Sequence, residues 1–556
     1  MTGLIQSAVL PEWWDPAGVF LALYRDSPYA FWLDAGAEAE TGVSYLGAAA
    51  GGSRFVTASV PEGTVTVTLA GAAAGAAAGA AAGAAAGAAA GAAAPAITSA
   101  PITSPETIFE FLREELAGTP ARDPDGDPDG DPDGDPDGRA HDGDRAAGFR
   151  LGWVGWLGYE LGAQTVGTPV HDSRFPDAAL LEVDRALVFD HAARTVTALV
   201  RHSPGDPAGD PASARDWARS VTLTLRASTE PAPAPPASAP ATAPRVRWRH
   251  DAGQYAELIR RCQEAIREGD AYQLCLTNEI RVNARPDPVL AYLTLRAGSP
   301  SHHGGLLRFG DTALLSASPE QFLAVTRDGL VTTKPIKGTS PRGRSARRDR
   351  ELRAGLESSE KERAENLMIV DLMRNDLGRI AELGSVTVTS LLAVESYAHV
   401  HQLVSTVEAR LAAGLSAVDA VASCFPAGSM TGAPKVSAMT ILDGLEGGPR
   451  GIYSGAFGYF GLDGAVDLAM VIRSIVLDAG GASIGTGGGI TALSDPAAEI
   501  EETRIKAAAL LAALGAAATA ASTAATAPAT AAATTPATAA ATAAASTPAT
   551  SSRGIE

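Results

Sequence analysis

The C-terminal half of the chain alternates between helical and strand-like hydrophobic patterns. Between Tyr255 and Ile266, apolar residues recur at helical spacing, and Gly269 supplies a stop. The next apolar run, 271–281, predicts a strand. A second helical pattern covers 359–377 and ends at Gly378.

The same reading continues to the end of the varied sequence. A helix is expected to start near residues 431–434, with a proline in its first turn, and to end before Gly447. The remaining expected elements are strands at 385–390, 455–460, 465–475 and 482–486, and a final helix at 495–514.

The N-terminal half contains strand-like runs at 19–23, 30–33 and 64–69. Between Gly148 and Glu160, glycines interleave with aromatic residues, which indicates strands that pack closely. With the C-terminal pattern, these runs predict an α+β fold with a large sheet component.

Several segments are too uniform in composition to form a packed core. Residues 71–94 repeat Gly-Ala-Ala-Ala and 123–138 repeat Asp-Pro-Asp-Gly. The second repeat lacks the later glutamate of a calcium loop, so we interpret it as solvated. The predicted organisation is an N-terminal region at 1–230 with those two insertions, a Pro/Ala linker at 231–244, a catalytic region at 245–515, and a disordered Ala/Thr-rich tail at 516–556.

The chain of 556 residues carries a net charge of −19, and eight of its aspartates lie in 123–138. An acidic chain does not suit nucleic acid or anionic membranes, so we expect neither as a partner. Its three cysteines form no metal or disulfide pattern, and its first residues do not resemble a signal peptide. A cytoplasmic location is therefore expected.

Two pairs of glutamates have the same spacing at predicted helix starts. Glu362 and Glu365 are three residues apart, as are Glu499 and Glu502, so each pair lies on one helical face. Either pair alone is typical of a solvated helix start, where the helix dipole favours acidic residues. Taken together, with no histidine at ligand spacing, they predict a site for a hard cation such as Mg²⁺.

Other segments are suited to holding an anion. Residues 428–435 open a helix, where free N–H groups can receive a carboxylate. The glycines at 487–489 follow a strand and allow close backbone approach. Arg473 lies within the apolar run 468–477, where an arginine needs an anionic partner, which could be structural or a ligand.

Two residues could perform acid–base or covalent chemistry. Lys337 lies in the short Pro-Ile-Lys-Gly-Thr segment at 335–339, and a lysine amine becomes nucleophilic when its surroundings lower its pKa. Glu320, in Ser-Pro-Glu-Gln-Phe, could protonate a leaving hydroxyl if its pKa is raised.

Together these segments resemble the chorismate-utilising enzymes, a family that includes anthranilate, aminodeoxychorismate, isochorismate and salicylate synthases. The resemblance covers about 250–512, and a weaker one extends to 31–34 and 155–159. It implies a large two-lobed β-sandwich flanked by helices. The motifs that carry it lie at 269–273, 318–320, 335–339, 363–371, 432–435 and 487–489.

Two positions distinguish among the members of the family. Lys337 resembles the lysine of aminodeoxychorismate synthase component I, whereas anthranilate synthase usually has alanine there. Gln273 stands where isochorismate and salicylate synthases have a water-activating lysine, and glutamine cannot act as that base. The resemblance therefore implies amination of chorismate to 4-amino-4-deoxychorismate, a step toward 4-aminobenzoate and folate or toward a specialised metabolite.

The resemblance also implies roles for individual residues. Mg²⁺ would be held by Glu365 and Glu502 directly and by Glu362 and Glu499 largely through water. Lys337 would attack the substrate ring, assisted by Glu320, before ammonia displaces it. The residues implied in substrate binding are Thr431, Tyr453, Arg473, Gly487, Gly488 and Lys506.

The sequence departs from the family pattern at one point that bears on the site. Gln402 occupies a position that is often histidine, and His401 is one residue early, so His401 and Gln273 are kept as further candidates. No Gly-x-Cys-x-Gly glutaminase motif is present, so ammonia is expected from a separate glutamine amidotransferase. The alternatives are an anthranilate synthase component I and a non-catalytic partner-binding scaffold.

Overall fold

The computed structural model describes residues 4–70, 100–117, 148–169, 171–202, 212–228, 244–397 and 400–516. Both repeats, linker residues 231–243 and the tail beyond 516 lie outside these ranges. The described residues belong to one compact unit.

Two antiparallel sheets of twelve strands each form the centre of this unit. In the first sheet, ten of the eleven strand pairings link neighbours along one path, and a short strand pairs β12 from the side. In order, the strands are β1 (Leu4–Val9), β10 (Thr195–His202), β9 (Arg185–Asp190), β3 (Val43–Ala48), β2 (Tyr29–Asp34), β13 (His303–Phe309), β14 (Thr312–Ser318), β23 (Ser474–Asp478), β24 (Gly481–Ile490), β12 (Gln273–Val282) and β11 (Val246–Trp248), with β20 (Gly432–Ala433) at the side.

The second sheet has the same construction, with one strand pairing β19 from the side. In order, its strands are β17 (Ile336–Pro341), β19 (Val400–Arg410), β16 (Leu330–Thr333), β15 (Gln321–Val325), β22 (Val466–Met470), β21 (Ala456–Gly461), β7 (Gly152–Leu157), β8 (Ala178–Val183), β4 (Arg54–Ser59), β5 (Thr64–Leu69) and β6 (Ile102–Ser104), with β18 (Thr387–Ser396) at the side.

Both sheets combine N-terminal and C-terminal strands. In the first sheet β2 pairs with β13, and in the second sheet β7 pairs with β21. The close packing expected from the glycine- and aromatic-rich segment occurs at β7, where a Cβ at Gly155 would overlap the carbonyl oxygen of Ala179. The two parts of the sequence therefore complete each other's sheets.

The alternation of side chains along the strands builds separate core layers on the two faces of each sheet. In β2, Phe31 belongs to a cluster that also contains Trp156 of β7 and Phe457 of β21, from the second sheet. The neighbouring Trp32 belongs to a different cluster, together with Tyr292 of α7 (Pro288–Gly298). One face of the first sheet thus packs on the second sheet and the other face packs on helices.

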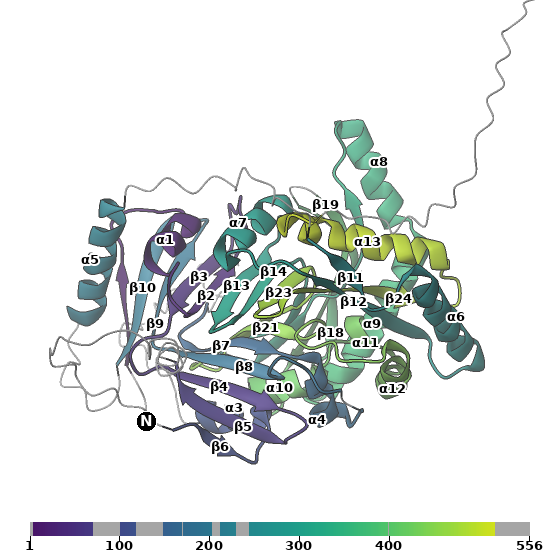
Figure 1. Ribbon diagram of the computed structural model, residues 1–556, viewed down its shortest axis with the longest axis horizontal. Helices are drawn as coiled ribbons and strands as arrows, with labels where there is room; N and C mark the ends of the chain where they lie inside the picture. Colours follow the sequence, from purple (N-terminus) through teal and green to yellow (C-terminus); the bar gives the residue numbers. More distant parts are fainter. Residues whose placement is uncertain are drawn as a thin grey trace, which may run out of the picture. The chain divides into compact units, whose positions relative to one another are not determined.

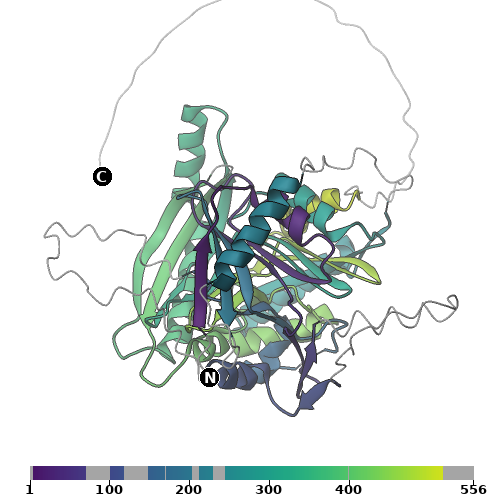
Figure 2. The same ribbon diagram turned by 90° about the vertical axis from the view of Figure 1, so that its left-hand side faces the viewer.

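Helices cover these outer faces (Figure 1). Over the first sheet, α5 packs on β1 and β10, α7 packs on β14, and α13 packs on β24. Figure 2 shows α5 in front of the part of the sheet that contains β1. Over the second sheet, α9 packs on β19. The remaining bounds are α1 (Pro16–Leu23), α3 (Ile108–Leu116), η1 (Tyr159–Leu161), α4 (Gly162–Val166), α5 (Ala212–Ala227), α6 (Ala252–Glu268), α8 (Ala346–Glu357), α9 (Glu360–Gly378), α10 (Ala417–Cys424), α11 (Gly428–Thr431), α12 (Lys435–Glu446) and α13 (Pro496–Ala513).

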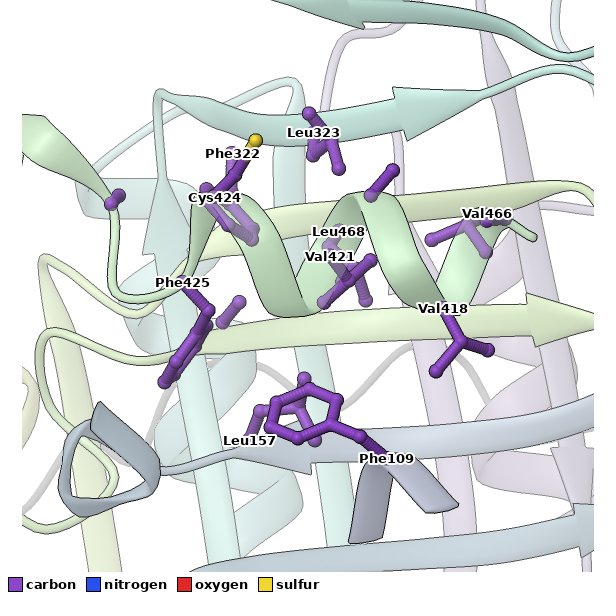
Figure 3. Close-up of a cluster of buried hydrophobic side chains, with 14 of the residues drawn as sticks. Phe109, Leu157, Phe322, Leu323, Val418, Val421, Cys424, Phe425, Val466 and Leu468 are labelled. Atoms are coloured by element: carbon purple, nitrogen blue, oxygen red, sulfur yellow. The ribbon is translucent and has the colours of Figure 1, made fainter. Parts of the chain in front are cut away.

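Helix α10 shows how the outer layer is held in place. It directs Val418 and Val421 toward the second sheet, and Phe425 follows at its end (Figure 3). Phe425 meets Phe322 of β15 edge-on, at 6.0 Å between ring centroids. The helix is anchored immediately before the segment that leads to α11, which lines the candidate site described below.

Two predicted elements differ from the structure. Residues 19–23, predicted as a strand, lie in α1, because Asp15 caps the helix through Ala17 N and Pro16 occupies its first turn. The strand predicted at 465–475 is divided into β22 and β23, and Arg473 lies in the break with φ +47.

The described helices include none that is long and apolar enough to cross a bilayer.

Candidate active site

One cavity of about 440 Å³ brings together side chains from distant parts of the C-terminal half. Its walls come from β17, β24, α9, α11 and α13, and from the break between β22 and β23. The predicted residues that line it are Glu320, Lys337, Glu362, Glu365, Tyr453, Arg473, Gly487, Gly488, Glu499, Glu502 and Lys506.

A second cavity, of about 460 Å³, lies beside β10 and α5. Its charged and polar groups are engaged with one another: Arg201 bonds to Glu182 at 2.6 Å, and His202 bonds to Ser213 at 2.6 Å. Because these groups satisfy each other, the second cavity offers less to a charged ligand than the first.

Lys337 reaches the first cavity from an irregular part of β17. The pairing of β17 with β19 shifts between Ile336 and Thr339, and Gly338 in this bulge has φ +87. A Cβ at Gly338 would lie 3.0 Å from Cγ of Glu362, so only glycine lets the bulge press against the start of α9. This contact fixes Lys337 beside the glutamates.

The two glutamate pairs approach the cavity from two helix starts. Ser359 caps α9 by accepting from the backbone N–H of Glu362, and Asp495 caps α13, with Pro496 in its first turn. A Cβ at Gly488 of β24 would lie 3.1 Å from Glu499 Oε2 and 3.9 Å from Glu502 Oε1. The glycine therefore provides a cradle in which the second pair sits directly over the strand.

Burial and neighbouring charges perturb these carboxylates. Burial raises the pKa of Glu365, although Lys337 and Lys361 oppose this, and its Oε1 is buried without a hydrogen bond among the described residues. Burial also raises the pKa of Glu499. Burial acts in the same direction on Glu502, but Lys506, 2.7 Å away, and other cations outweigh it, so the pKa of Glu502 is lowered.

These carboxylates fit a hard divalent cation, although they are not drawn tightly together. Within the described ranges, no three acidic, cysteine or histidine side chains are close enough to form a ready-made metal site. However, the oxygen-only donor set, the unpartnered Glu365 Oε1 and the cradle at Gly488 suit Mg²⁺, which binds through few carboxylates and retains water. Glu365 and Glu499, one from each helix, both lie near the amine of Lys361, at 3.9 and 3.7 Å.

Glu320 and Arg473 supply an acid and a cation on other parts of the wall. Burial raises the pKa of Glu320, and its carboxylate is bonded by Ser429 of α11. Burial lowers the pKa of Arg473, and its guanidinium has no hydrogen bond or ion pair with any residue that the structure describes. Because the partly buried guanidinium of Arg473 has no counter-charge among the described residues, it is suited to bind an anionic ligand in the cavity.

The other predicted binding residues differ in their positions. Tyr453 lines the cavity, and its ring occupies the space where a Cβ at Gly485 would be. Lys506 donates to the Gly487 carbonyl oxygen at 2.8 Å. Thr431 is fully buried and does not line the cavity, because its hydroxyl donates to the carbonyl oxygens of α11 and the preceding residue.

The two further candidates, Gln273 and His401, also lie outside the lining. His401 is buried and bonds to Ser396 at 2.8 Å and to Asp349 of α8 at 3.0 Å. Since neighbouring side chains of β19 point to opposite faces, Gln402 faces the cavity instead. The Gln273 amide packs where a Cβ at Gly489 would be, which explains that glycine.

Three lining residues were not among the individual residues predicted for the site. They are Lys361, Gln402 and Ser429, although Ser429 lies in the predicted anion-holding segment 428–435. Only Lys361 carried a local signal, because a cation in the first turn of a helix opposes the helix dipole and needs an acidic partner elsewhere.

Comparison with known proteins agrees with this geometry. The profile of the chorismate binding enzymes matches residues 77–512. The chain belongs to this family. Among curated proteins, an aminodeoxychorismate synthase of Streptomyces griseus is 51% identical over 370 residues, covering 66% of this chain and 50% of the relative.

Other relatives within the chorismate binding enzymes show the same relationship. An aminodeoxychorismate synthase of Streptomyces pristinaespiralis is 47% identical, covering 66% of this chain and 51% of the relative. The chain thus spans about half the length of the curated aminodeoxychorismate synthases just named. An anthranilate synthase component 1 of Streptomyces coelicolor is 40% identical, covering 66% of this chain and 73% of the relative.

Solved structures also resemble this member of the family. Anthranilate synthase component I from Streptococcus pneumoniae is 32% identical with a TM-score of 0.57, covering 65% of this chain and 80% of that one. The menaquinone-specific isochorismate synthase of Escherichia coli has a TM-score of 0.58 over 92% of this chain and 95% of its own, at 17% identity. The second likeness bears on the fold alone.

Proposed function

We propose that the cavity aminates chorismate with ammonia to give 4-amino-4-deoxychorismate. The observation that carries this proposal is that Lys337 faces the four glutamates in one cavity, whose wall also holds the unpartnered guanidinium of Arg473. Chorismate has two carboxylates and a ring hydroxyl that must leave. The cavity offers cations for the carboxylates and a buried acid for the hydroxyl.

Substrate binding divides between the two charged sides of the cavity. Arg473 and Lys506 bind one carboxylate, and Lys506 must first loosen its bond to Glu502 at 2.7 Å. Glu365 and Glu502 would hold the metal directly, and Glu362 and Glu499 would act largely through water. When bound, Mg²⁺ neutralises the ring carboxylate and thereby makes the ring more open to attack.

Lys337 and Glu320 carry out the chemistry. The neutral amine of Lys337 attacks C2 of the ring, the two conjugated ring double bonds both shift, and the C4–O bond breaks. Glu320 donates its proton to the departing oxygen, which leaves as water. Ammonia then adds at C4, both double bonds shift back, the C2–N bond to Lys337 breaks, and the proton released by the new C4 ammonium returns to Glu320. Glu320 is suited to its role because its burial keeps a proton on the carboxyl to higher pH.

Ammonia comes from a separate glutamine amidotransferase. All three cysteines in the sequence are buried, and burial raises the pKa of Cys262 and Cys424 to about 12. Burial also raises the pKa of Cys275. Such thiols are poor nucleophiles for glutamine hydrolysis. The product would be used for 4-aminobenzoate and folate or for a specialised metabolite.

One incubation tests the proposal against its rivals. Purified protein is mixed with chorismate, Mg²⁺ and ammonium chloride without any lyase, and products are separated by chromatography. We expect 4-amino-4-deoxychorismate. Fluorescent anthranilate would instead favour the activity in the name of the Streptomyces coelicolor relative, an anthranilate synthase component 1. Absence of both turnover and Mg²⁺-dependent chorismate binding in a calorimeter would favour a non-catalytic scaffold.

A further inference from the structure

Lys361 occupies an unfavourable place on its own helix. It is in the first turn of α9, between the cap residue Ser359 and Glu362. The partial positive charge of a helix N-terminus repels a cation there. Its pairing with Glu365 at i,i+4 also runs in the weaker direction, with lysine N-terminal to glutamate. Local helix energetics therefore do not explain this lysine.

The position of Lys361 is explained by the acidic residues that its side chain approaches on two helices. The Lys361 amine is 3.9 Å from Glu365 Oε1 on α9 and 3.7 Å from Glu499 Oε1 on α13. It thus bridges the same two helices that a divalent cation would join. Both distances exceed hydrogen-bonding range, so the amine is held by charge without being locked in position.

The surrounding charges act together on this amine. All four glutamates of the cavity, Glu499 and Glu365 foremost, attract the charge of this amine. The side chain is 56% exposed, so it has room to withdraw into solvent. Glu365 Oε1, which it approaches, has no hydrogen bond within the described ranges and is free to accept a different cation.

We propose that Lys361 is an internal counter-ion of Glu365 and Glu499, partly neutralising the glutamate cluster in the metal-free protein and withdrawing when a divalent cation binds. Lys361 thereby sets the affinity of the site for the metal. The inference rests on the metal site of the proposed function. In this inference the glutamates bind the metal, whereas Lys361 competes with the metal for the glutamates.

Calorimetric titration of the metal-free full-length protein with MgCl₂, without chorismate, tests this role. Replacing Lys361 by methionine keeps the length of the side chain and removes its charge. We expect Lys361→Met to bind Mg²⁺ about three- to tenfold more tightly than wild type. Lys361→Arg should remain close to wild type. Arg363→Met removes a charge from the same turn, at an exposed side chain outside the cavity lining, and should change the affinity less than twofold.

Thermal unfolding supplies a second readout. In chelator, Lys361→Met should melt below wild type because four carboxylates then repel one another, and saturating Mg²⁺ should remove the difference. Unchanged or weaker Mg²⁺ binding by Lys361→Met would overturn the inference, as would a melting deficit that persists in Mg²⁺. If wild type itself bound no Mg²⁺, the metal site of the proposed function would fail instead.

Discussion

Lys435 and Asp376 form a buried ion pair, with 2.6 Å between Nζ and Oδ2, that ties the start of α12 to the end of α9. Lys435 also donates to the carbonyl oxygen of Cys424 at 3.0 Å, where α10 ends. The pair therefore connects α12 and α10 to the helix that carries Glu362 and Glu365. Its effect on the site is to position other residues, because neither side chain lines the cavity.

Breaking this pair should destabilise the protein. Burial raises the pKa of Asp376 and the charge of Lys435 opposes that rise. Lys435→Met should therefore leave the buried Asp376 carboxylate with only the half-exposed Arg379, 3.2 Å from its other oxygen, and lower the free energy of unfolding by about 2–3 kcal/mol. Chemical denaturation measures the loss. The double variant Lys435→Met/Asp376→Leu should recover much of it, and a loss equal to that of the single variant would contradict the pairing argument.

Replacing Arg473, unlike replacing Lys435, should weaken chorismate binding without destabilising the fold. Its guanidinium has no acidic partner among the described residues. Arg473→Met should weaken chorismate binding about 10–100-fold, the loss expected for hydrogen bonds to a charged group, while leaving the melting temperature unchanged or raised. Calorimetry with chorismate and differential scanning measure the two quantities.

Arg450 provides the matched comparison. It is also buried, but it bonds to both carboxylate oxygens of Glu446, at 2.7 and 2.8 Å. Arg450→Met should therefore lower the melting temperature clearly. Equal destabilisation by the Arg473 and Arg450 variants would indicate that Arg473 has a structural partner after all.

Glu320 should impose a pH dependence on turnover. Because burial raises its pKa, the acid form persists above the pH at which an ordinary glutamate ionises, and kcat should fall as pH rises through the raised pKa. Glu320→Gln should lose this limb of the profile and about 10²–10⁴-fold in kcat. A profile with the same descending limb in the variant would assign the acid to another group.

The raised pKa of Glu320 also makes the stability of the fold depend on pH. The direction is opposite to that of an ion-paired carboxylate, whose pKa is lowered. The folded state holds the Glu320 proton more tightly than the unfolded state does. Its contribution is therefore present at low pH and is lost as pH rises through the raised folded pKa. Melting temperatures across pH should decline less steeply for Glu320→Gln than for wild type.

His401 and Gln402 are adjacent in β19 but have different roles: His401 holds the fold together and Gln402 lines the cavity. His401 bonds to Ser396 and Asp349, whereas Gln402 lines the cavity with a buried, unpartnered Oε1 within the described ranges. His401→Asn should lower the melting temperature and leave kcat/KM within about threefold of wild type. Gln402→Leu should lower kcat/KM more than tenfold with little effect on melting. The reverse result would restore His401 as the site residue.

The parts of the fold that could be predicted depend on local patterns. The helices at 360–378 and 496–513 carry caps, periodic apolar residues and clear ends, so their glutamate pairs were placed correctly on each helix. The pairing of β2 with β13 depends on residues about 270 positions apart, and no local pattern encodes it. The segment 19–23 was interpreted by its apolar run alone, although Asp15 and Pro16 marked a helix start.

The site residues that were missed or misplaced depend on tertiary contacts. Lys361 could not be identified as a site residue from the sequence, because it approaches Glu499, which lies on another helix. Thr431 is an exception, because its hydroxyl bonds locally to the carbonyl oxygens of Ala427 and Gly428, and its side chain lies outside the cavity lining. The break at Arg473 interrupts an apolar run that has no glycine or proline to mark it, so the run predicted one continuous strand.

Lys337 is proposed to direct ammonia to C4 of chorismate, and the fate of isotope-labelled ammonia reports on this role. Wild type and Lys337→Ala are incubated with chorismate, Mg²⁺ and ¹⁵N-ammonium, and the products are identified by mass spectrometry. Lys334→Ala, which removes an exposed lysine three residues away, is the control. We expect ¹⁵N-labelled 4-amino-4-deoxychorismate from wild type and the control, and its loss by at least about 10³-fold in Lys337→Ala. Labelled anthranilate from wild type, or an unchanged rate in Lys337→Ala, would contradict it.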